Sequence, residues 1–388
     1  MSLLVHSARK VDAEGHIDDF WLVADGLTIT ATGTGDGWRK HAEGVSPQSI
    51  VDAGGHWLTP GFLDLHGHGG GGHAFDDGPA EVRAGLTTHR ARGTTRSVIS
   101  LVANPLDALE RSLAGIADLA ERDPLVLGSH LEGPYIASPR RGAHSPDHVR
   151  SPEPAEVERL LAASRGTLRQ ITLAPELPGA LESIDVLTAA GVTVAVGHTE
   201  AGFEQAREAF QRGARLLTHA FNAMEGIHHR SPGPVVAAME NPLVTLELIL
   251  DGLHVHPSVA RLLFAGAPGR VALVSDAMAA AGAADGDYRL GELDVTVQDG
   301  AALLAGTDTI AGSTLTQDAA LRIAITEVGV TPEVAVAALT LAPARALGLE
   351  AQHGLLKPGH VADAVLLDSR WHVLRVWACG AIIPTDEF

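Results

Sequence analysis

Two closely spaced histidines follow one of the apolar runs in this 388-residue sequence. The stretch GFLDLHGHGGGG (61–72) places His66 and His68 one residue apart, directly before a run of glycines. Residues i and i+2 of a strand point to the same face, so both imidazoles can enter one metal centre. The glycines lack the Gly-Lys-Ser/Thr sequence that ends a phosphate-binding loop. We therefore interpret them as a tight turn beside a crowded site.

Residues that can bind metal follow six of the eight apolar runs between positions 61 and 275. A single histidine at a strand end is usually an ordinary polar group, and we prefer that interpretation for His130 by itself. Stray residues would not recur in register behind so many runs, so the whole set favours a metal centre. The set consists of His66 and His68 after the first run, His130 and Glu132 after the third, His198 after the fifth, His219 and Asn222 after the sixth, Asp251 and His254 after the seventh, and Asp276 after the eighth.

The apolar runs alternate with amphipathic stretches of helical length, which predicts eight β/α units. Eight such units predict an α/β fold with a TIM-like (β/α)8 barrel, in which chemistry is carried at the carboxyl ends of the strands. The continuous apolar character of the runs is typical of parallel strands that are buried on both faces. The predicted strands lie at 61–65, 95–101, 124–129, 170–174, 192–197, 215–218, 243–250 and 270–275.

Both ends of the chain are β-like, and the N-terminal end has Asp-Gly turns at 25–26 and 36–37. The economical arrangement is one small β-sandwich domain built from the two ends together. We expect its N-terminal part at 1–57, the barrel at 58–348 and its C-terminal part at 349–388. A hairpin insertion is expected near 283–306, followed by a helical stretch at roughly 314–348.

Net charge, hydropathy and cysteine content limit the kinds of partner and compartment that we expect for this protein. The formal net charge of -19 argues against nonspecific binding to nucleic acid. No apolar run is long enough for a membrane-spanning helix, so we expect no membrane association. The single cysteine, Cys379, excludes an internal disulfide and fits a cytoplasmic protein.

The candidate ligands offer only nitrogen and oxygen, which suits zinc, iron(II) or manganese. Many two-metal barrel hydrolases bridge their ions with a carbamylated lysine. Here the only lysines are Lys10, Lys40 and Lys357, and none follows a barrel strand. A carboxylate must therefore take that place, and Glu132 is the best placed. Asp276 follows the last strand, where a general base is needed.

Several motifs resemble the N-acetylglucosamine-6-phosphate deacetylase family of the amidohydrolase superfamily. They are HLEGPY (130–135), GHT (197–199), THAFNAM (218–224), DGLH (251–254) and VSDAM (274–278), with RRGAH (140–144), TLAPE (172–176), HRSPG (229–233) and GLLKPGHVADAVLLD (354–368) in addition. The resemblance covers nearly the whole chain. The last motif is shared across amidohydrolases, so it supports the superfamily rather than the substrate.

The resemblance implies hydrolysis of N-acetyl-D-glucosamine 6-phosphate to D-glucosamine 6-phosphate and acetate, in amino sugar catabolism and cell-wall recycling. It implies a homodimer in which Arg230 reaches the neighbouring active site. Because both His66 and His68 are present, the chain resembles the members with two divalent ions. The implied residues are Glu132, His198 and His219 at the main metal, His66 and His68 at the second with Glu132 shared, Asp276 as a metal-site residue and catalytic acid/base, and His144, Asn222, Ala223, Arg230 and His254 at the substrate.

Two other functions compete with this interpretation. A cyclic-amide hydrolase or a nucleobase deaminase belongs to the same superfamily, but such enzymes lack HLEGPY and usually need the lysine bridge or another set of histidines. A non-catalytic barrel that has lost its metals would show missing ligands, and here the set is complete.

Overall fold

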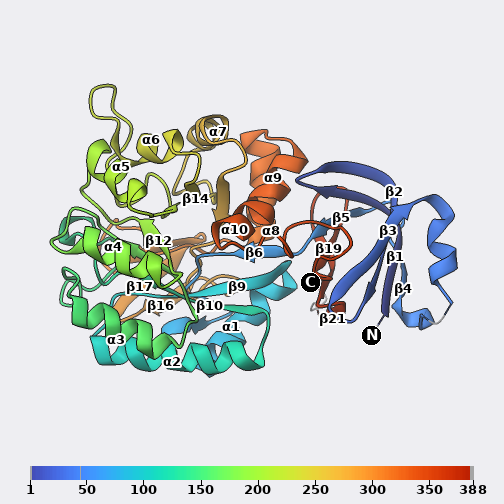
Figure 1. The fold of residues 1–388 in the computed structure, drawn as a ribbon, viewed down its shortest axis with the longest axis horizontal. Coiled ribbons are helices and arrows are strands. Elements are labelled where there is room, and N and C mark those ends of the chain that lie inside the picture. Colours follow the sequence, from blue (N-terminus) through green and yellow to red (C-terminus); the bar gives the residue numbers. More distant parts are fainter. Residues whose placement is uncertain (1, 44, 385–388) are drawn as a thin grey trace. The chain divides into compact units, whose positions relative to one another are not determined.

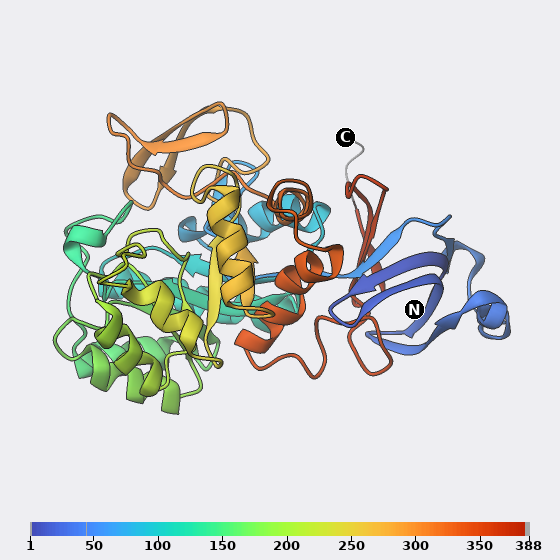
Figure 2. The same cartoon turned by 90° about the horizontal axis from the view of Figure 1, so that it is seen from above.

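The computed structural model describes residues 2–43 and 45–384, which form two compact units (Figures 1 and 2). One unit contains the described residues of 1–63, 89–96 and 317–388, and the other contains 64–88 and 97–316. The domain boundaries expected from the sequence stay a prediction. Among the described residues, no helix combines the length and the apolar character that crossing a bilayer requires.

The first unit contains an eight-stranded sheet to which both ends of the chain contribute. Strand β5 joins the two contributions, because it pairs in parallel with β1 and antiparallel with β19. The order is β21-β20-β19-β5-β1-β2-β3, with β4 paired to β1. The strands are β1 (Ser2–Asp12), β2 (Gly15–Asp25), β3 (Thr28–Thr34), β4 (Ile50–Asp52), β5 (Trp57–Pro60), β19 (Ala364–Leu367), β20 (Val373–Ala378) and β21 (Ala381–Ile383).

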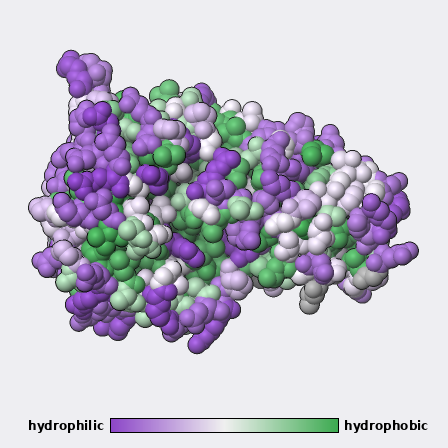
Figure 3. Space-filling model, in the orientation of Figure 1, coloured by the Kyte–Doolittle hydropathy of each residue, from purple (hydrophilic) through white to green (hydrophobic). Residues whose placement is uncertain are grey.

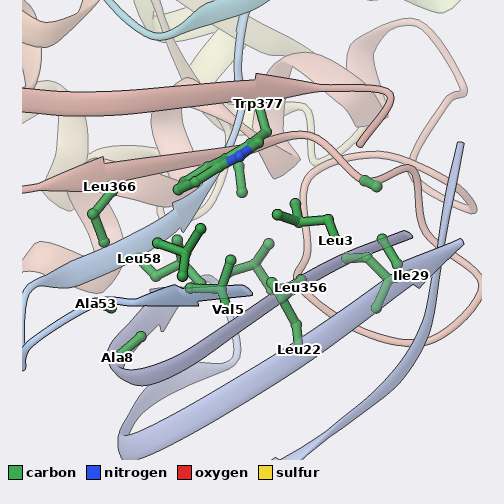
Figure 4. Packing of buried hydrophobic residues seen from close by; sticks show 14 of the residues in the cluster. Leu3, Val5, Ala8, Leu22, Ile29, Ala53, Leu58, Leu356, Leu366 and Trp377 are labelled. Carbon is green, nitrogen blue, oxygen red and sulfur yellow. The ribbon is translucent and has the colours of Figure 1, made fainter. Parts of the chain in front are cut away.

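A single apolar cluster lies between the two contributions to this sheet (Figure 4). Leu366 and Trp377 of the C-terminal strands face Leu3, Leu22 and Leu58 of the N-terminal strands. This packing bears out a separate sheet domain made from both chain ends. The same unit holds the helical segments α8 (Gln317–Ile323), η5 (Ala324–Val328), α9 (Pro332–Leu339) and α10 (Leu341–Ala346), and the short helices η1 (Gly35–His41) and η2 (Pro47–Ser49).

The second eight-stranded sheet is the predicted barrel, and a strand lies at each of the eight predicted positions. The registers described between its strands are all parallel. Beyond the two edge strands, the Asp276 amide donates to His66 O at 2.8 Å and the His68 amide to Ala277 O at 2.7 Å, which nearly closes the barrel. The order is β15 (Val271–Val274), β14 (Thr245–Ile249), β13 (Leu216–Leu217), β12 (Thr193–Val196), β11 (Leu168–Leu173), β10 (Val126–Glu132), β9 (Thr94–Leu101) and β6 (Phe62–Asp64).

The helices that alternate with these strands bury one apolar face each. In α2, Leu109, Leu113 and Ile116 are buried at spacings of three and four residues, as an amphipathic helix requires. The helices are α1 (Pro79–Ala91), α2 (Leu106–Arg122), α3 (Pro154–Ser164), α4 (Ala180–Ala189), α5 (Phe203–Gln211), α6 (Gly233–Glu240) and α7 (Pro257–Gly266), with the short η3 (Phe75–Asp77) and η4 (Ser138–Arg140).

Two small sheets lie beside the barrel strands. The glycine run forms the tight hairpin of β7 (Gly69–Gly70) and β8 (His73–Ala74), with Gly71 and Gly72 at φ +60 and +91. A Cβ at Gly69 would lie 2.5 Å from His73 O, so the predicted crowded turn is confirmed. The segment expected to hold a hairpin forms three antiparallel strands, shown in orange in Figure 2. They are β16 (Gly286–Leu290), β17 (Leu293–Gln298) and β18 (Ala301–Leu304).

Candidate functional site

The backbone turns sharply at three of the candidate residues, directly beyond their strands. His198, His219 and Asp276 have φ values of 47°, 26° and 46°, in the left-handed region that non-glycine residues rarely adopt. Each such residue costs of order 1 kcal/mol or more, and such strain is found mostly at functional sites. All three side chains are buried. The carboxyl ends of β12, β13 and β15 therefore direct these side chains into one site.

One group of ligand atoms surrounds Oε1 of Glu132. His198 Nε2 lies 3.1 Å from this oxygen, and His219 Nε2 lies 3.0 Å from it. The two nitrogens are 3.0 Å apart. Two imidazole nitrogens and a carboxylate oxygen thus converge from the ends of β10, β12 and β13, and this group can hold a metal ion.

A second group adjoins the first and shares Glu132 with it. His68 Nε2 lies 3.1 Å from Glu132 Oε2, and His66 Nε2 lies 3.2 Å from Oε1. Asp276 Oδ1 lies 3.5 Å from His66 Nε2 and 3.4 Å from His68 Nε2. His66, His68, Glu132 and Asp276 can also hold a metal ion. The structure therefore brings together all six residues expected at the metal centre.

The chemistry of this donor set fits divalent metal ions. Burial by itself raises the pKa of Glu132, but the charge of His66 and the hydrogen bonds from His144 and His198 hold it well below its usual range. The carboxyl is therefore ionised. Imidazole lone pairs that converge within about 3 Å repel one another unless a proton or a cation lies between them. Nitrogen and oxygen donors alone suit zinc, iron(II) or manganese.

All of the candidate metal-binding residues except His66 line a cavity of 570 Å³. Four of the five residues expected to bind substrate, His144, Asn222, Ala223 and His254, line this cavity. Apolar side chains from other elements also line the cavity. They are Val102 beyond β9, Ile249 of β14, Leu290 of β16 and Ile310 beyond β18.

His144 is placed as a neutral hydrogen-bond donor. The Ala103 amide donates to its Nδ1 at 3.2 Å, so Nε2 carries the proton. Nε2 lies 3.3 Å from Glu132 Oε2 and faces the cavity. Burial lowers the pKa of His144 to about 4. The imidazole is therefore uncharged at neutral pH and can donate to an oxygen of a bound ligand.

His254 is paired with Asp251, and it lines the same cavity. The His254 Nδ1 atom lies 2.7 Å from Asp251 Oδ2. Burial alone would lower the pKa of His254, but the hydrogen bond and the charge of Asp251 raise it above its ordinary value. The pair favours the imidazolium form, and this suits binding of an anionic group.

The amidohydrolase family model matches residues 57–380. The chain belongs to this family. Among its relatives, the N-acetylgalactosamine-6-phosphate deacetylase of Escherichia coli O157:H7 is 39% identical, with 98% of this chain and 99% of the relative covered. The N-acetylglucosamine-6-phosphate deacetylase of Bos taurus is 37% identical, with 86% and 84% covered.

Solved structures agree with this assignment. The D267A mutant of N-acetyl-D-glucosamine-6-phosphate deacetylase from Mycobacterium smegmatis, in complex with N-acetyl-D-glucosamine-6-phosphate, has a TM-score of 0.92 and 40% identity, with 98% of this chain and 99% of that chain covered. The enzyme from Pasteurella multocida has a TM-score of 0.91 and 27% identity, with 98% and 99% covered. This amidohydrolase is thus similar to N-acetylglucosamine-6-phosphate deacetylases over nearly its full length.

Arg230 does not line the cavity of this amidohydrolase. It is exposed on a narrow loop between β13 and α6, where His228 and Ser231 form an isolated bridge. The loop is the yellow-green projection in Figure 1 and a hydrophilic projection in Figure 3. The arginines that line the cavity are Arg140, which pairs with Glu225, and Arg141. Both arginines lie in the motif RRGAH (140–144), but the sequence analysis predicted no role for either one.

Two other buried polar residues, His130 and Glu247, lie beside His66 in this amidohydrolase. His130 Nδ1 lies 2.9 Å from Ser100 Oγ, and Nε2 lies 2.8 Å from Thr172 Oγ1, so His130 is a satisfied core histidine. Glu247 on β14 contacts His66, and sequence reasoning missed it. The available signal was a glutamate inside the otherwise apolar run LVTLELIL (243–250).

Proposed function

We propose that this amidohydrolase hydrolyses the acetamide of N-acetyl-D-glucosamine 6-phosphate to D-glucosamine 6-phosphate and acetate. The observation that carries the proposal is that the buried His/Glu/Asp group lines the same cavity as His254. A hydrolytic centre and a group that favours an anion thus face one ligand-sized space. The similarity to deacetylases of amino sugar phosphates supports the same reaction.

We assign two divalent ions, zinc, iron or manganese, to the two ligand groups. His198, His219 and Glu132 would hold the first, and His66, His68, Glu132 and Asp276 would hold the second. When bound, such ions polarise an amide carbonyl and lower the pKa of a water molecule.

Asp276 is the acid/base in this proposal. It lines the cavity beside both histidines of the second group. Its carboxylate takes a proton from water as the water oxygen adds to the acetyl carbon. The protonated carboxyl then gives that proton to the amide nitrogen, the C–N bond breaks, and acetate and the free amine result. With substrate bound, His144 would exchange Glu132 for the carbonyl oxygen as the acceptor of its Nε2 hydrogen, because negative charge develops on that oxygen.

The phosphate is bound at the other end of the substrate. The paired His254 would supply the positive charge that binds the phosphate, and Asn222 and Ala223 line the same cavity. Arg230 is exposed outside the cavity, which fits a homodimer in which Arg230 of the partner subunit reaches this site. A guanidinium binds phosphate in a bidentate manner that lysine cannot reproduce.

A second substrate is favoured by one observation. The relative that is 39% identical over 98% of this chain is named an N-acetylgalactosamine-6-phosphate deacetylase. The two sugars differ only in the configuration at C4, so the same centre can act on either one.

The experiment measures acetate released from three compounds by the metal-loaded protein: the 6-phosphates of N-acetylglucosamine and N-acetylgalactosamine, and unphosphorylated N-acetylglucosamine. We expect the first to have the highest kcat/KM and the unphosphorylated sugar the lowest. A higher value for the galactosamine compound would reassign the substrate. No acetate from either phosphate would overturn the deacetylase proposal.

A further inference from the structure

We propose that Glu247 is a positioning residue that holds His66 as a ligand of the second ion and thereby sets the affinity of that ion. The proposal rests on the two-ion centre assigned above, and it adds a residue that does not itself touch the cavity. Glu247 is fully buried in the middle of β14 (Thr245–Ile249), where a charged side chain is expected only with close partners.

The contacts of Glu247 determine which nitrogen of His66 carries the proton. Glu247 Oε2 lies 3.2 Å from His66 Nδ1, and both side chains are fully buried. A carboxylate oxygen accepts a hydrogen bond from an imidazole N–H, so this contact favours a proton on Nδ1. Nε2 lies 3.2 Å from Glu132 Oε1 and 3.1 Å from His68 Nε2, so it is the nitrogen left to bind the ion. This is the tautomer that a metal ligand needs.

Glu247 is itself held in place from both sides. Gln170 Nε2 on β11 donates to Oε1 at 2.7 Å, and the His219 amide donates to Oε2 at 3.4 Å. The carboxylate therefore has a hydrogen-bond donor on each oxygen and cannot turn away from His66 without losing one. A carboxylate behind a ligating imidazole also raises the basicity of that ligand.

The other histidines have different surroundings. His198 Nδ1 lies 2.8 Å from Arg140 O. The Nδ1 atoms of His68 and His219 are buried without a hydrogen-bond partner in the described part of the chain. Because Glu247 contacts a side chain of the second group but only a backbone amide of the first, its removal should weaken the second ion selectively.

The test measures the dissociation constant of each zinc ion by competition with a chelator, and it needs no turnover. Glu247→Gln retains the size and removes the charge, and Glu247→Leu removes the hydrogen bond as well. We expect the second ion to bind roughly 10-fold more weakly in the Gln variant and roughly 100-fold more weakly in the Leu variant, the range found for such outer partners. The first ion should change less than about 3-fold in both variants.

Thr172→Val is the matched control. Thr172 is equally buried in the barrel, and its side chain bonds His130 and Thr218 but no proposed metal ligand. This variant should bind both ions as the wild type does. A cooperative unfolding transition of each metal-free variant shows that the variant is folded. If Glu247→Leu does not fold, the zinc affinities of Glu247→Gln alone test the proposal. Unchanged affinity for the second ion in a folded Glu247 variant, or equal weakening of both ions, overturns the proposal.

The outcome is distinguishable from failure of the proposed function. A wild-type protein that binds two ions but releases no acetate from either sugar phosphate would overturn the reaction and leave the role of Glu247 standing. A wild-type protein that binds only one ion would overturn the role of Glu247, and the reaction would still be judged by acetate release.

Discussion

Individual side chains at this site differ in charge because their partners differ. His144 receives a backbone hydrogen bond on Nδ1, and burial lowers its pKa to about 4, so it is neutral. His254 has an aspartate at 2.7 Å, which raises its pKa and favours the cation. One imidazole is thus suited to an oxygen atom of the amide and the other to a phosphate, although both line the same cavity.

The first prediction concerns the proton-carrying role of Asp276. Asp276→Asn has nearly the same size but cannot take up a proton. We expect kcat to fall at least ~100-fold, the scale of a positioned acid/base, with little change in substrate binding. Single-turnover kinetics together with binding of the phosphorylated sugar check this. Turnover close to that of the wild type would remove Asp276 from its assigned role.

The second prediction concerns pH and the Asp251–His254 pair. An imidazolium binds phosphate below its pKa and loses its charge as the pH rises through that pKa. Asp251→Asn removes the charge that raises the pKa of His254, so the proton is lost at lower pH. At a pH between the pKa of His254 in the variant and its raised pKa in the wild type, we expect KM for the phosphorylated sugar to rise roughly 10-fold, the loss of about one charge-assisted hydrogen bond.

The matched control for this variant is the unphosphorylated sugar, whose KM should not depend on the substitution. KM profiles from pH 5.5 to 9 would show the difference. Coincident profiles for wild type and variant with the phosphorylated sugar would exclude the pair from phosphate binding.

At the scale of elements, loops beyond the strands position the candidate metal ligands and the residues that line the cavity. The β7–β8 hairpin directly follows His68, and the Phe75 amide donates to His68 O at 2.7 Å. Asn222 and Ala223 lie in the segment beyond β13, and Leu290 lies on the three-stranded sheet of β16, β17 and β18. The barrel strands provide a common edge, and these loops determine what lines the cavity.

The third prediction concerns Gly69→Ala in this hairpin. The added methyl would lie 2.5 Å from His73 O and 2.8 Å from Ala279 N, which are backbone atoms that cannot easily move. We expect the free energy of unfolding of the metal-free protein to fall by ~1–3 kcal/mol. Gly72→Ala is the control, because its methyl meets open space and the cost is only that of φ +91, about 1 kcal/mol. Urea unfolding compares the two, and equal stability of Gly69→Ala and wild type would contradict the prediction.

At the scale of the whole molecule, Arg230 is the one expected substrate-binding residue that does not line the cavity. The other four, His144, Asn222, Ala223 and His254, line the same cavity as the candidate metal ligands, whereas Arg230 is exposed on a loop. A symmetric dimer can complete each site with a residue of the other subunit.

The fourth prediction uses mixed dimers of one Arg230→Ala subunit and one Asp276→Asn subunit. If Arg230 acts on the partner's site, one site has both defects and the other has none. About half the activity per dimer should then remain, with the KM of the wild type. If Arg230 acts in its own subunit, each site has one defect and high-affinity turnover disappears. The second result would overturn the shared site and leave the reaction unaffected.

The sequence by itself determined the barrel, the sheet built from both chain ends and the set of residues that the structure brings together as a candidate metal centre. These follow from local patterns, because an apolar run sets a strand and the next residues must lie at its carboxyl end. The interpretation of His130 as a core residue was also correct. Glycine spacing indicated the crowded turn at Gly69.

Only the tertiary structure decided how these residues meet. That Glu132 contacts five histidines depends on the stagger between β10 and its neighbours, which no local pattern encodes. The contact of Glu247 with His66 joins residues 181 positions apart, and it needs the seventh strand to lie near the first in a nearly closed barrel. The exposure of Arg230 depends on the direction of a projecting loop. Side-chain types and spacing are local properties, whereas register, burial and closure arise from contacts between distant segments.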